Sequence, residues 1–224
     1  SAVKAMLRAQ GRFARSFHDA MLVEPEGLLN QTTTPYKVYA AYAKRWHALA
    51  YEQVHRVLPA PTQLAPVPEQ IQRQPIPTLA QLGFTLTQTL PPATEHAAKQ
   101  MLDDFFDPNL EYSVEKYATT RNRPAKDSTS KLSMHLRMGT ISPRTCLQAA
   151  VNALENPLSA SQRRGVDKWL AELAWREYYN QIAFHFPHAL NGALNPKFDA
   201  IGWRNDHAEF EQWKLGKTGY PLVD

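Results

Sequence analysis

The chain has 224 residues, 43% of them apolar, which allows one large or two small domains with a substantial core. Its net charge of +4 at pH 7 is a mild basic bias, compatible with an anionic partner. No stretch approaches about 20 uncharged apolar residues, and there is no signal peptide, so the sequence excludes a membrane span and predicts a cytosolic context. The single Cys146 excludes an internal disulfide framework, and the eight scattered histidines give no metal-ligand pattern.

The first part of the chain predicts two helices separated by an extended region. Residues 1–10 have helical periodicity, and Gly11 ends that helix. Residues 13–23 are apolar enough for a strand or an extended segment. Thr34 and Pro35 then provide an N-cap and a first-turn residue for the next helix.

A proline-rich stretch follows. Eight of the 17 prolines lie between Pro59 and Pro92, among many glutamines and threonines. Proline at this density sustains neither a helix nor a central strand, because it lacks the backbone N–H. We expect residues 59–92 to be an extended linker, wrapped on a surface or mobile, with a domain boundary inside it.

The rest of the chain has helical periodicity. The expected helices cover residues 93–106, 131–138 and 142–154, and a fourth contains residues 168–179 and ends at Phe186-Pro187. Gly139 ends the second of these helices, and Ser142 with Pro143 begins the third as cap and first residue.

Residues 168–179 are the most informative segment because they form two helical stripes. The mixed stripe is Glu172, Trp175, Arg176 and Tyr179, and the apolar stripe is Val166, Trp169, Leu170 and Leu173. The apolar stripe can face a core, while the mixed one offers a flat ring, a guanidinium and a carboxylate to a single ligand. On spacing alone, a buried-edge helix with an internal Glu172–Arg176 pair is the more frequent explanation.

Residues 128–133, Ser-Thr-Ser-Lys-Leu-Ser, lie at a predicted helix start. Their hydroxyls and Lys131 surround free backbone N–H groups at the positive end of a helix, which suits an anion. An ordinary cap, with Ser130 as N-cap and Ser133 closing it, explains the pattern equally well.

A basic run lies in the same region. It consists of Arg121, Arg123, Lys126, Lys131, Arg137 and Arg144, against only Asp127. Such a run forms either a solvated face or a surface that meets phosphates, and the two are about equally frequent.

Three blocks of the sequence together resemble one known family. They are residues 117–144, with Tyr117-Ala-Thr-Thr-Arg121 and Thr129-Ser-Lys-Leu-Ser133; residues 169–179, Trp-Leu-Ala-Glu-Leu-Ala-Trp-Arg-Glu-Tyr-Tyr; and residues 216–224, Gly-Lys-Thr-Gly-Tyr-Pro-Leu-Val-Asp. In order and spacing they resemble the flavin-binding domain of the DNA photolyase/cryptochrome family, most of all a class I cyclobutane pyrimidine dimer photolyase. Phe17-His-Asp19 and Pro35–Tyr39 resemble the last part of the family's antenna domain.

The resemblance implies a mainly α fold. Residues 93–224 would be the N-terminal half of the all-helical FAD-binding domain, preceded by the C-terminal end of an α/β, Rossmann-like antenna domain at 1–58 and the linker at 59–92. The chain would start inside the antenna domain and stop before the second half of the flavin pocket. That second half would carry the residues around the isoalloxazine edge and the two inner tryptophans of the electron relay.

The resemblance also implies roles for individual residues. The FAD-binding residues would be Tyr117, Thr129, Ser130, Lys131, Leu132, Ser133, Trp169 and Arg176. The DNA-binding residues would be Arg121, Glu172, Trp175, Arg176 and Tyr179. Glu172 and Trp175 would also act in catalysis, and Trp203 would be the outermost tryptophan of the electron relay. The family commonly has arginine where Lys131 stands, and lysine keeps the charge but loses the bidentate fork.

The implied activity is light-driven repair of cyclobutane pyrimidine dimers, in which excited, reduced FAD donates an electron to a flipped-out dimer. The partner would be UV-damaged DNA. The full-length protein would be a monomer in a bacterial-type cytoplasm. A cryptochrome-type photoreceptor, a helical nucleic-acid-binding module without flavin, and a flavin-free inactive fragment are the alternatives. The identity of an antenna chromophore, of folate or deazaflavin type, is left undetermined. Arg15 stands near the position where the family often has an acidic residue that helps to hold folate.

Overall fold

The computed structural model describes residues 2–15, 18–54, 59, 61–72 and 74–224. Phe17, which contributes to the resemblance to the antenna domain, lies outside the described residues. The chain divides into two compact units, Ser1–Gln181 and Ile182–Asp224, each treated separately below.

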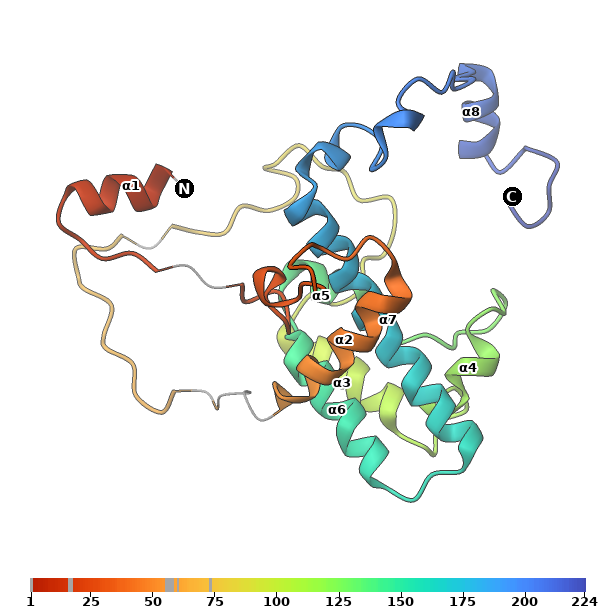
Figure 1. Ribbon diagram of the computed structural model, residues 1–224, viewed down its shortest axis with the longest axis horizontal. Helices are drawn as coiled ribbons and strands as arrows, with labels where there is room; N and C mark the ends of the chain where they lie inside the picture. Colours follow the sequence, from red (N-terminus) through yellow and green to blue (C-terminus); the bar gives the residue numbers. More distant parts are fainter. Residues whose placement is uncertain (1, 16–17, 55–58, 60, 73) are drawn as a thin grey trace. The chain divides into compact units, whose positions relative to one another are not determined.

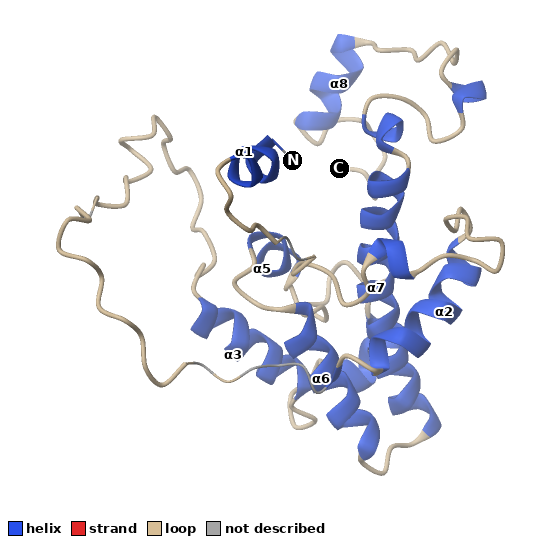
Figure 2. Ribbon diagram, turned by 60° about the vertical axis from the view of Figure 1, so that its left-hand side comes forward, coloured by secondary structure: helices blue, strands red, loops and turns tan. Residues whose placement is uncertain are grey.

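The described residues are helical, joined by turns and loops, and contain no named β-strand (Figures 1 and 2). The α-helices are α1 (Ala2–Ala9), α2 (Tyr39–Tyr51), α3 (Glu95–Phe106), α4 (Tyr117–Thr120), α5 (Ser133–Met138), α6 (Pro143–Glu155), α7 (Ala160–His185) and α8 (His207–Lys214). Short 3₁₀ helices are η1 (Pro25–Gly27), η3 (Val114–Lys116), η4 (Pro187–Leu190) and η5 (Pro196–Phe198). The mainly α fold expected from the sequence is therefore confirmed.

Local signals located several helix ends correctly. Ser142 caps α6, since its hydroxyl accepts the backbone N–H of Arg144 at 3.2 Å, and Pro143 is the first helical residue. Gly139 ends α5 in the left-handed conformation, with φ of 76°, as expected for a helix C-terminus. Helix α7 ends at His185, just before Phe186-Pro187.

One prediction about the N-terminal region, the start of its second helix, is wrong. Helix α2 begins at Tyr39 rather than at Pro35, because Asn30 and Thr34 close a turn on each other, and the Thr34 hydroxyl accepts the Asn30 amide N–H at 2.7 Å. The Thr34 side chain thus belongs to this turn, and the residue before α2 is Val38. Of the two alternatives for residues 13–23, a strand or an extended segment, the described part forms no strand.

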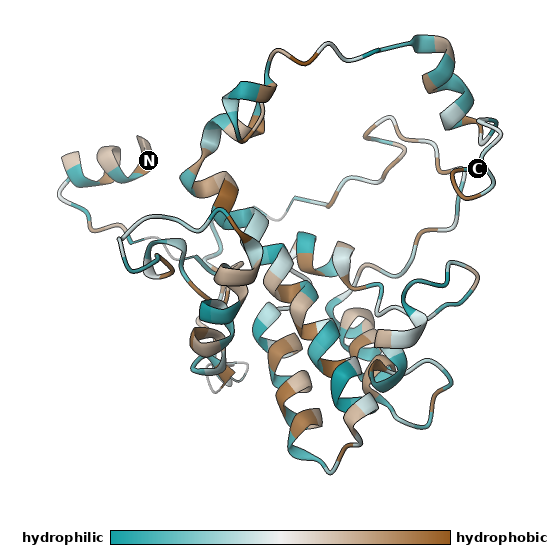
Figure 3. Cartoon of the chain, turned by 45° about the vertical axis from the view of Figure 1, so that its right-hand side comes forward, coloured by the Kyte–Doolittle hydropathy of each residue, from teal (hydrophilic) through white to brown (hydrophobic). Residues whose placement is uncertain are grey.

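The core of the N-terminal unit is built around the apolar stripe of α7. Val166, Leu170 and Leu173 on α7 are at most 4% exposed. The other helices contribute buried side chains, including Tyr42, Trp46, Leu102, Phe105, Cys146 and Leu147. Apolar and hydrophilic residues alternate along the same helices (Figure 3), as expected for helices that bury one face.

Gly165 allows α7 to approach the turn at η3. A Cβ atom added at this glycine would lie 2.4 Å from the carbonyl oxygens of both Val114 and Glu115. Only a residue without a side chain fits this close approach. The contact places residues 114–117 against α7, next to the candidate site.

The residues predicted to form the linker are irregular in the structure. The described residues between Pro59 and Pro92 form neither helix nor strand and are exposed. The predicted domain boundaries at residues 58 and 92 stay a prediction. Within the described ranges, no helix combines the length and the apolar character needed to cross a membrane.

Candidate functional site

Helix α7 presents the two stripes that the sequence predicts. The apolar stripe is buried, whereas Glu172, Trp175 and Arg176 are half-buried and Tyr179 is 64% exposed. The mixed stripe therefore lies where side chains meet solvent, as a binding site requires.

Two predicted cofactor residues, Trp169 on the apolar stripe of α7 and Ser130, contact each other. The indole N–H of Trp169 donates to the Ser130 hydroxyl at 3.2 Å. The Trp169 ring packs against Phe105 and Phe106, with ring centroids 5.8 and 5.2 Å away. This hydrogen bond joins the segment 128–133 to α7.

Tyr117 lies in the same cluster. Its ring packs edge-on against Phe105, with centroids 5.8 Å apart, and its aromatic face lies 5.2 Å from the Arg121 guanidinium. Burial raises the pKa of Tyr117, so its phenol remains protonated. Tyr117 and Trp169 thus both pack against one aromatic side chain, Phe105.

Arg121, which lies over the Tyr117 ring, forms an ion pair with Glu172. The hydrogen bond to Glu172 is the largest cause that raises the pKa of Arg121. Their side chains are 24% and 36% exposed, respectively, so the pair is accessible from solvent. Glu172 therefore pairs with Arg121 and not, as one interpretation of the sequence had it, within its own helix.

The segment 128–133 forms an irregular turn before α5. Lys131 is in the left-handed region, with φ of 52°, so α5 begins only at Ser133. The predicted N-cap role of Ser130 is wrong, because the residue before α5 is Leu132 and the Ser130 hydroxyl accepts from Trp169 instead. Thr129 and Ser133 are exposed.

Lys131 and Ser128 are the polar groups of this turn that bear on an anionic ligand. The ammonium group of Lys131 contacts Asp127 at 2.6 Å while both side chains remain more than half exposed. The Ser128 hydroxyl is buried and has no hydrogen-bond partner among the described residues. A turn with an exposed cation and a buried hydroxyl that lacks a partner fits an anionic group.

Trp175 stacks on an aromatic residue from the N-terminal segment. The rings of Trp175 and Tyr39 are 3.4 Å apart between centroids and 5° from parallel. Tyr179 lies 5.7 Å away at 24°, with its centroid displaced. The predicted lesion-facing tryptophan is therefore held by its neighbours.

Arg176 joins the N-terminal segment to α5. It donates to the Ala20 carbonyl at 2.8 Å and to the Leu136 carbonyl at 3.4 Å. This places Arg176 beside α5, and its expected contact with a flavin stays a prediction.

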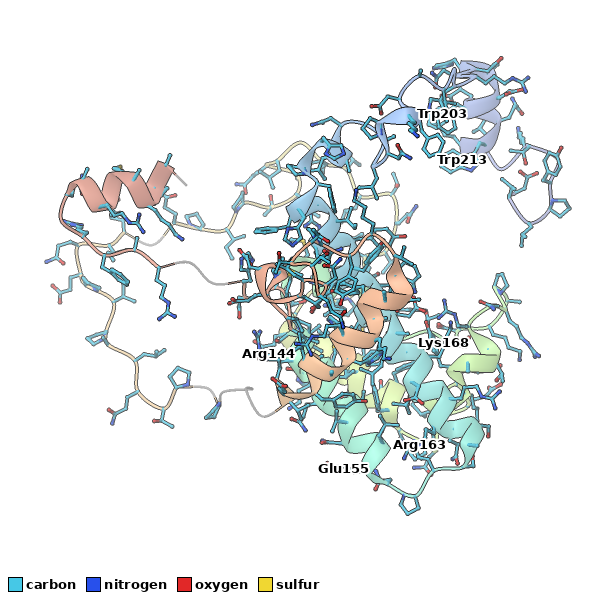
Figure 4. The ribbon with its side chains drawn as sticks, in the orientation of Figure 1. Arg144, Glu155, Arg163, Lys168, Trp203 and Trp213 are labelled. Carbon is cyan, nitrogen blue, oxygen red and sulfur yellow. The ribbon has the colours of Figure 1, made fainter. Side chains whose placement is uncertain are left out.

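The basic run is only partly a free surface. Arg144, labelled in Figure 4, donates to the carbonyls of Asp19 and Met21 at 3.2 and 3.3 Å. Lys126 donates to the Tyr112 hydroxyl. Arg123 and Arg137 are exposed, which leaves them the best placed to meet phosphates.

Trp203 belongs to the C-terminal unit (Figure 4). It is 74% exposed. Its role in an electron relay stays a prediction.

The sequence did not single out Glu177, which is 1% exposed. Its carboxylate accepts the backbone N–H groups of Leu22 and Val23 at 2.6 and 3.2 Å and the indole N–H of Trp46 at 2.8 Å. Burial raises the pKa of Glu177, although these three donors oppose the shift. Its position four residues after Leu173 places it on the apolar stripe of α7, and this spacing could have predicted its burial.

Comparison with known proteins gives consistent results. Residues 169–224 match the family model described as the FAD binding domain of DNA photolyase. The chain is 31% identical over 223 residues to a deoxyribodipyrimidine photo-lyase of Halobacterium salinarum and 34% identical over 230 residues to one of Synechococcus sp.. Each match covers 99% of this chain but 46% of the relative, so the chain spans less than half the length of these relatives.

Solved structures agree with the sequence comparisons. A bacterial class III photolyase from Agrobacterium tumefaciens superimposes with a TM-score of 0.78 at 30% identity, over 99% of this chain and 45% of that one. A cryptochrome from Synechocystis sp. gives a TM-score of 0.76 at 25% identity, over 98% of this chain and 45% of that one. By sequence and by structure, the chain is therefore similar to members of the DNA photolyase/cryptochrome family.

Proposed function

We propose that the protein carrying this chain repairs cyclobutane pyrimidine dimers in DNA under blue light, with FAD as its cofactor. The observation that carries the proposal is that α7 provides candidate residues for two sites. Trp169 reaches the turn 128–133 through Ser130, while Glu172 and Trp175 lie on the half-buried stripe beside Arg121. One helix thus provides residues for a cofactor and for a damaged base.

The residues around the turn fit FAD. The Lys131 ammonium group and the hydroxyls of Thr129, Ser130 and Ser133 suit a pyrophosphate, and the buried Ser128 hydroxyl lacks a partner among the described residues. Tyr117, Trp169 and Arg176 would hold the rest of the cofactor, with Leu132 as buried support. When bound, FAD supplies the light absorption and the electron that opens the dimer.

On the lesion side, Glu172 would hydrogen-bond to the base edges and Trp175 would form a flat apolar wall. A damaged dimer is extruded at a lower free-energy cost than a normal pair because it stacks and pairs poorly. Since Glu172 is paired with Arg121, lesion binding would exchange that partner for the bases and leave Arg121 to meet the DNA backbone. Tyr179 is exposed beside Trp175 and would contact DNA too.

The curated relatives named as photo-lyases favour repair over a photoreceptor function. The proposal includes a monomer that acts in the cytoplasm, as the resemblance implies. A flavin-free inactive fragment is tested separately, by the absorption spectrum of these 224 residues after purification.

The function is tested with a thymine-dimer oligonucleotide and an undamaged one of the same sequence. We expect dimer repair in blue light only, and a Trp175→Ala variant should lose roughly 1–3 kcal/mol of dimer affinity, the contribution of one base–aromatic stack. Repair that is equally fast in darkness contradicts the photochemical proposal, and unchanged dimer affinity removes Trp175 from the lesion pocket.

A further inference from the structure

Tyr39 covers one face of the tryptophan that the proposed function places against the lesion. The two rings are nearly parallel, 5° apart, with centroids 3.4 Å from each other. No base can enter between rings at this separation. A base that stacks on Trp175 must therefore either use the opposite face of the indole or displace Tyr39.

Displacement is opposed by the way in which Tyr39 is held. Its hydroxyl donates to the Ala171 carbonyl on α7 at 3.0 Å, and its ring meets Tyr178 edge-on, 5.7 Å between centroids. Tyr39 is also the first residue of α2, whose Trp46 is bonded to the buried Glu177.

The segment just before α2 is fastened to the same helix. The Tyr178 hydroxyl donates to the Lys37 carbonyl at 2.7 Å, and the Gln181 side-chain amide donates to the Tyr36 carbonyl at 2.9 Å. Bonds on both sides of Tyr39 in the sequence therefore hold it against α7, which favours a fixed support over a movable cover.

The negative charge of Glu172 acts on the phenol of Tyr39. Burial raises the pKa of Tyr39, and the negative charge of Glu172 raises it further. The phenol is therefore neutral at physiological pH and remains a hydrogen-bond donor to Ala171. Tyr39 thus stacks on Trp175 and bonds to Ala171, the residue before Glu172, although it comes from the N-terminal segment.

We propose that Tyr39 is a positioning residue of the lesion pocket, which supports the indole of Trp175 from behind so that a damaged base stacks on its other face. The inference rests on the proposed function and adds to it a specificity determinant outside the residues 93–224. It requires that loss of the Tyr39 ring weaken binding of dimer DNA while leaving binding of undamaged DNA unchanged.

The test is the ratio of dissociation constants for undamaged and dimer-containing oligonucleotides, measured on the protein that carries this chain. Tyr39→Leu should lower this ratio by about 2- to 10-fold, the range of one aromatic pair. Tyr39→Phe keeps the ring and should stay within about twofold of the wild type. Tyr51→Leu is the matched control, because Tyr51 lies at the far end of α2 and is 41% exposed, and it should leave the ratio unchanged.

A ratio that is unchanged or raised by Tyr39→Leu overturns the proposal, and a raised ratio would identify Tyr39 as a cover. A loss in Tyr39→Phe equal to that in Tyr39→Leu also overturns it, because the hydroxyl and not the ring would then matter. If Tyr39→Leu does not fold, Tyr39→Met gives the same comparison. The Trp175→Ala variant separates the two proposals. If Trp175→Ala leaves the ratio of dissociation constants unchanged, the proposed lesion site is wrong. If the ratio falls in Trp175→Ala but not in Tyr39→Leu, only the proposed role of Tyr39 is wrong.

Discussion

The carboxylate of Glu177 accepts the indole N–H of Trp46 at 2.8 Å, inside the core between α2 and α7. The same carboxylate accepts two backbone N–H groups, from Leu22 and Val23. One buried side chain of α7 therefore fixes both the N-terminal segment and the helix that carries Tyr39. The geometry of the candidate lesion pocket depends on a residue that does not face the pocket.

Removal of Glu177 should destabilise the fold. In Glu177→Ala, three buried donors lose their acceptor, and we expect a loss of about 3 kcal/mol or more in the free energy of unfolding. Glu177→Gln keeps one acceptor oxygen and should lose less. Chemical denaturation measures both. The control is Glu155→Ala on α6, labelled in Figure 4 and exposed, which should change stability by less than about 0.5 kcal/mol. Equal effects at positions 155 and 177 would contradict the assigned role.

Glu177 should also make stability depend on pH. Burial raises its pKa in the folded protein above the ordinary value of 4.5. Between these two pKa values the folded state binds more protons than the unfolded state, so this contribution is complete below about pH 4.5 and is lost as the pH rises through the folded pKa. The difference in unfolding free energy between wild type and Glu177→Gln should therefore fall with rising pH. A difference that increases over this range would show that the three donors outweigh burial.

At Gly165, the close packing and helix propensity predict opposite effects of an alanine substitution on the free energy of unfolding. Alanine is the better helix former, yet its Cβ would lie 2.4 Å from two backbone carbonyl oxygens of η3. Gly165→Ala should thus lower the unfolding free energy by about 1–3 kcal/mol. In Gly27→Ala the added atom meets nothing within 4 Å, so the melting temperature should hardly change. A stabilised Gly165→Ala variant would rule out the close packing of α7 against residues 114–115.

The Arg121–Glu172 pair should contribute little to stability because both side chains reach solvent. A double-mutant cycle with Arg121→Gln and Glu172→Gln should give a coupling energy of about 0.5–1 kcal/mol that decreases with added salt. The Lys131–Asp127 pair is more exposed and should show a smaller coupling. A coupling of several kcal/mol would make the pair a structural element and argue against its exchange for DNA.

The sequence predicted well what depends on neighbours along the chain. The Ser142 cap, the left-handed Gly139 and the two stripes of α7 follow from local spacing and backbone preference. The start of α2 was missed because Asn30 competes for the Thr34 side chain. The start of α5 was missed because Lys131 has a left-handed backbone conformation, which a lysine does not predict.

Contacts between distant segments could not be predicted in this way. Nothing near Trp175 in the sequence indicates that Tyr39 covers its ring, and nothing near Trp46 indicates that Glu177 accepts its N–H. Both depend on how α2 lies on α7. The residues of the candidate site were instead proposed through the family resemblance, because members of a family share contacts between distant segments.

The most direct test of the account is the rate of thymine-dimer repair as a function of wavelength, measured beside the absorption spectrum of the purified protein. Repair should be absent in darkness and should follow the absorption of the bound flavin through the blue and near-ultraviolet. Repair that proceeds in the dark, or whose wavelength dependence does not follow the flavin spectrum, would contradict light-driven repair by this protein.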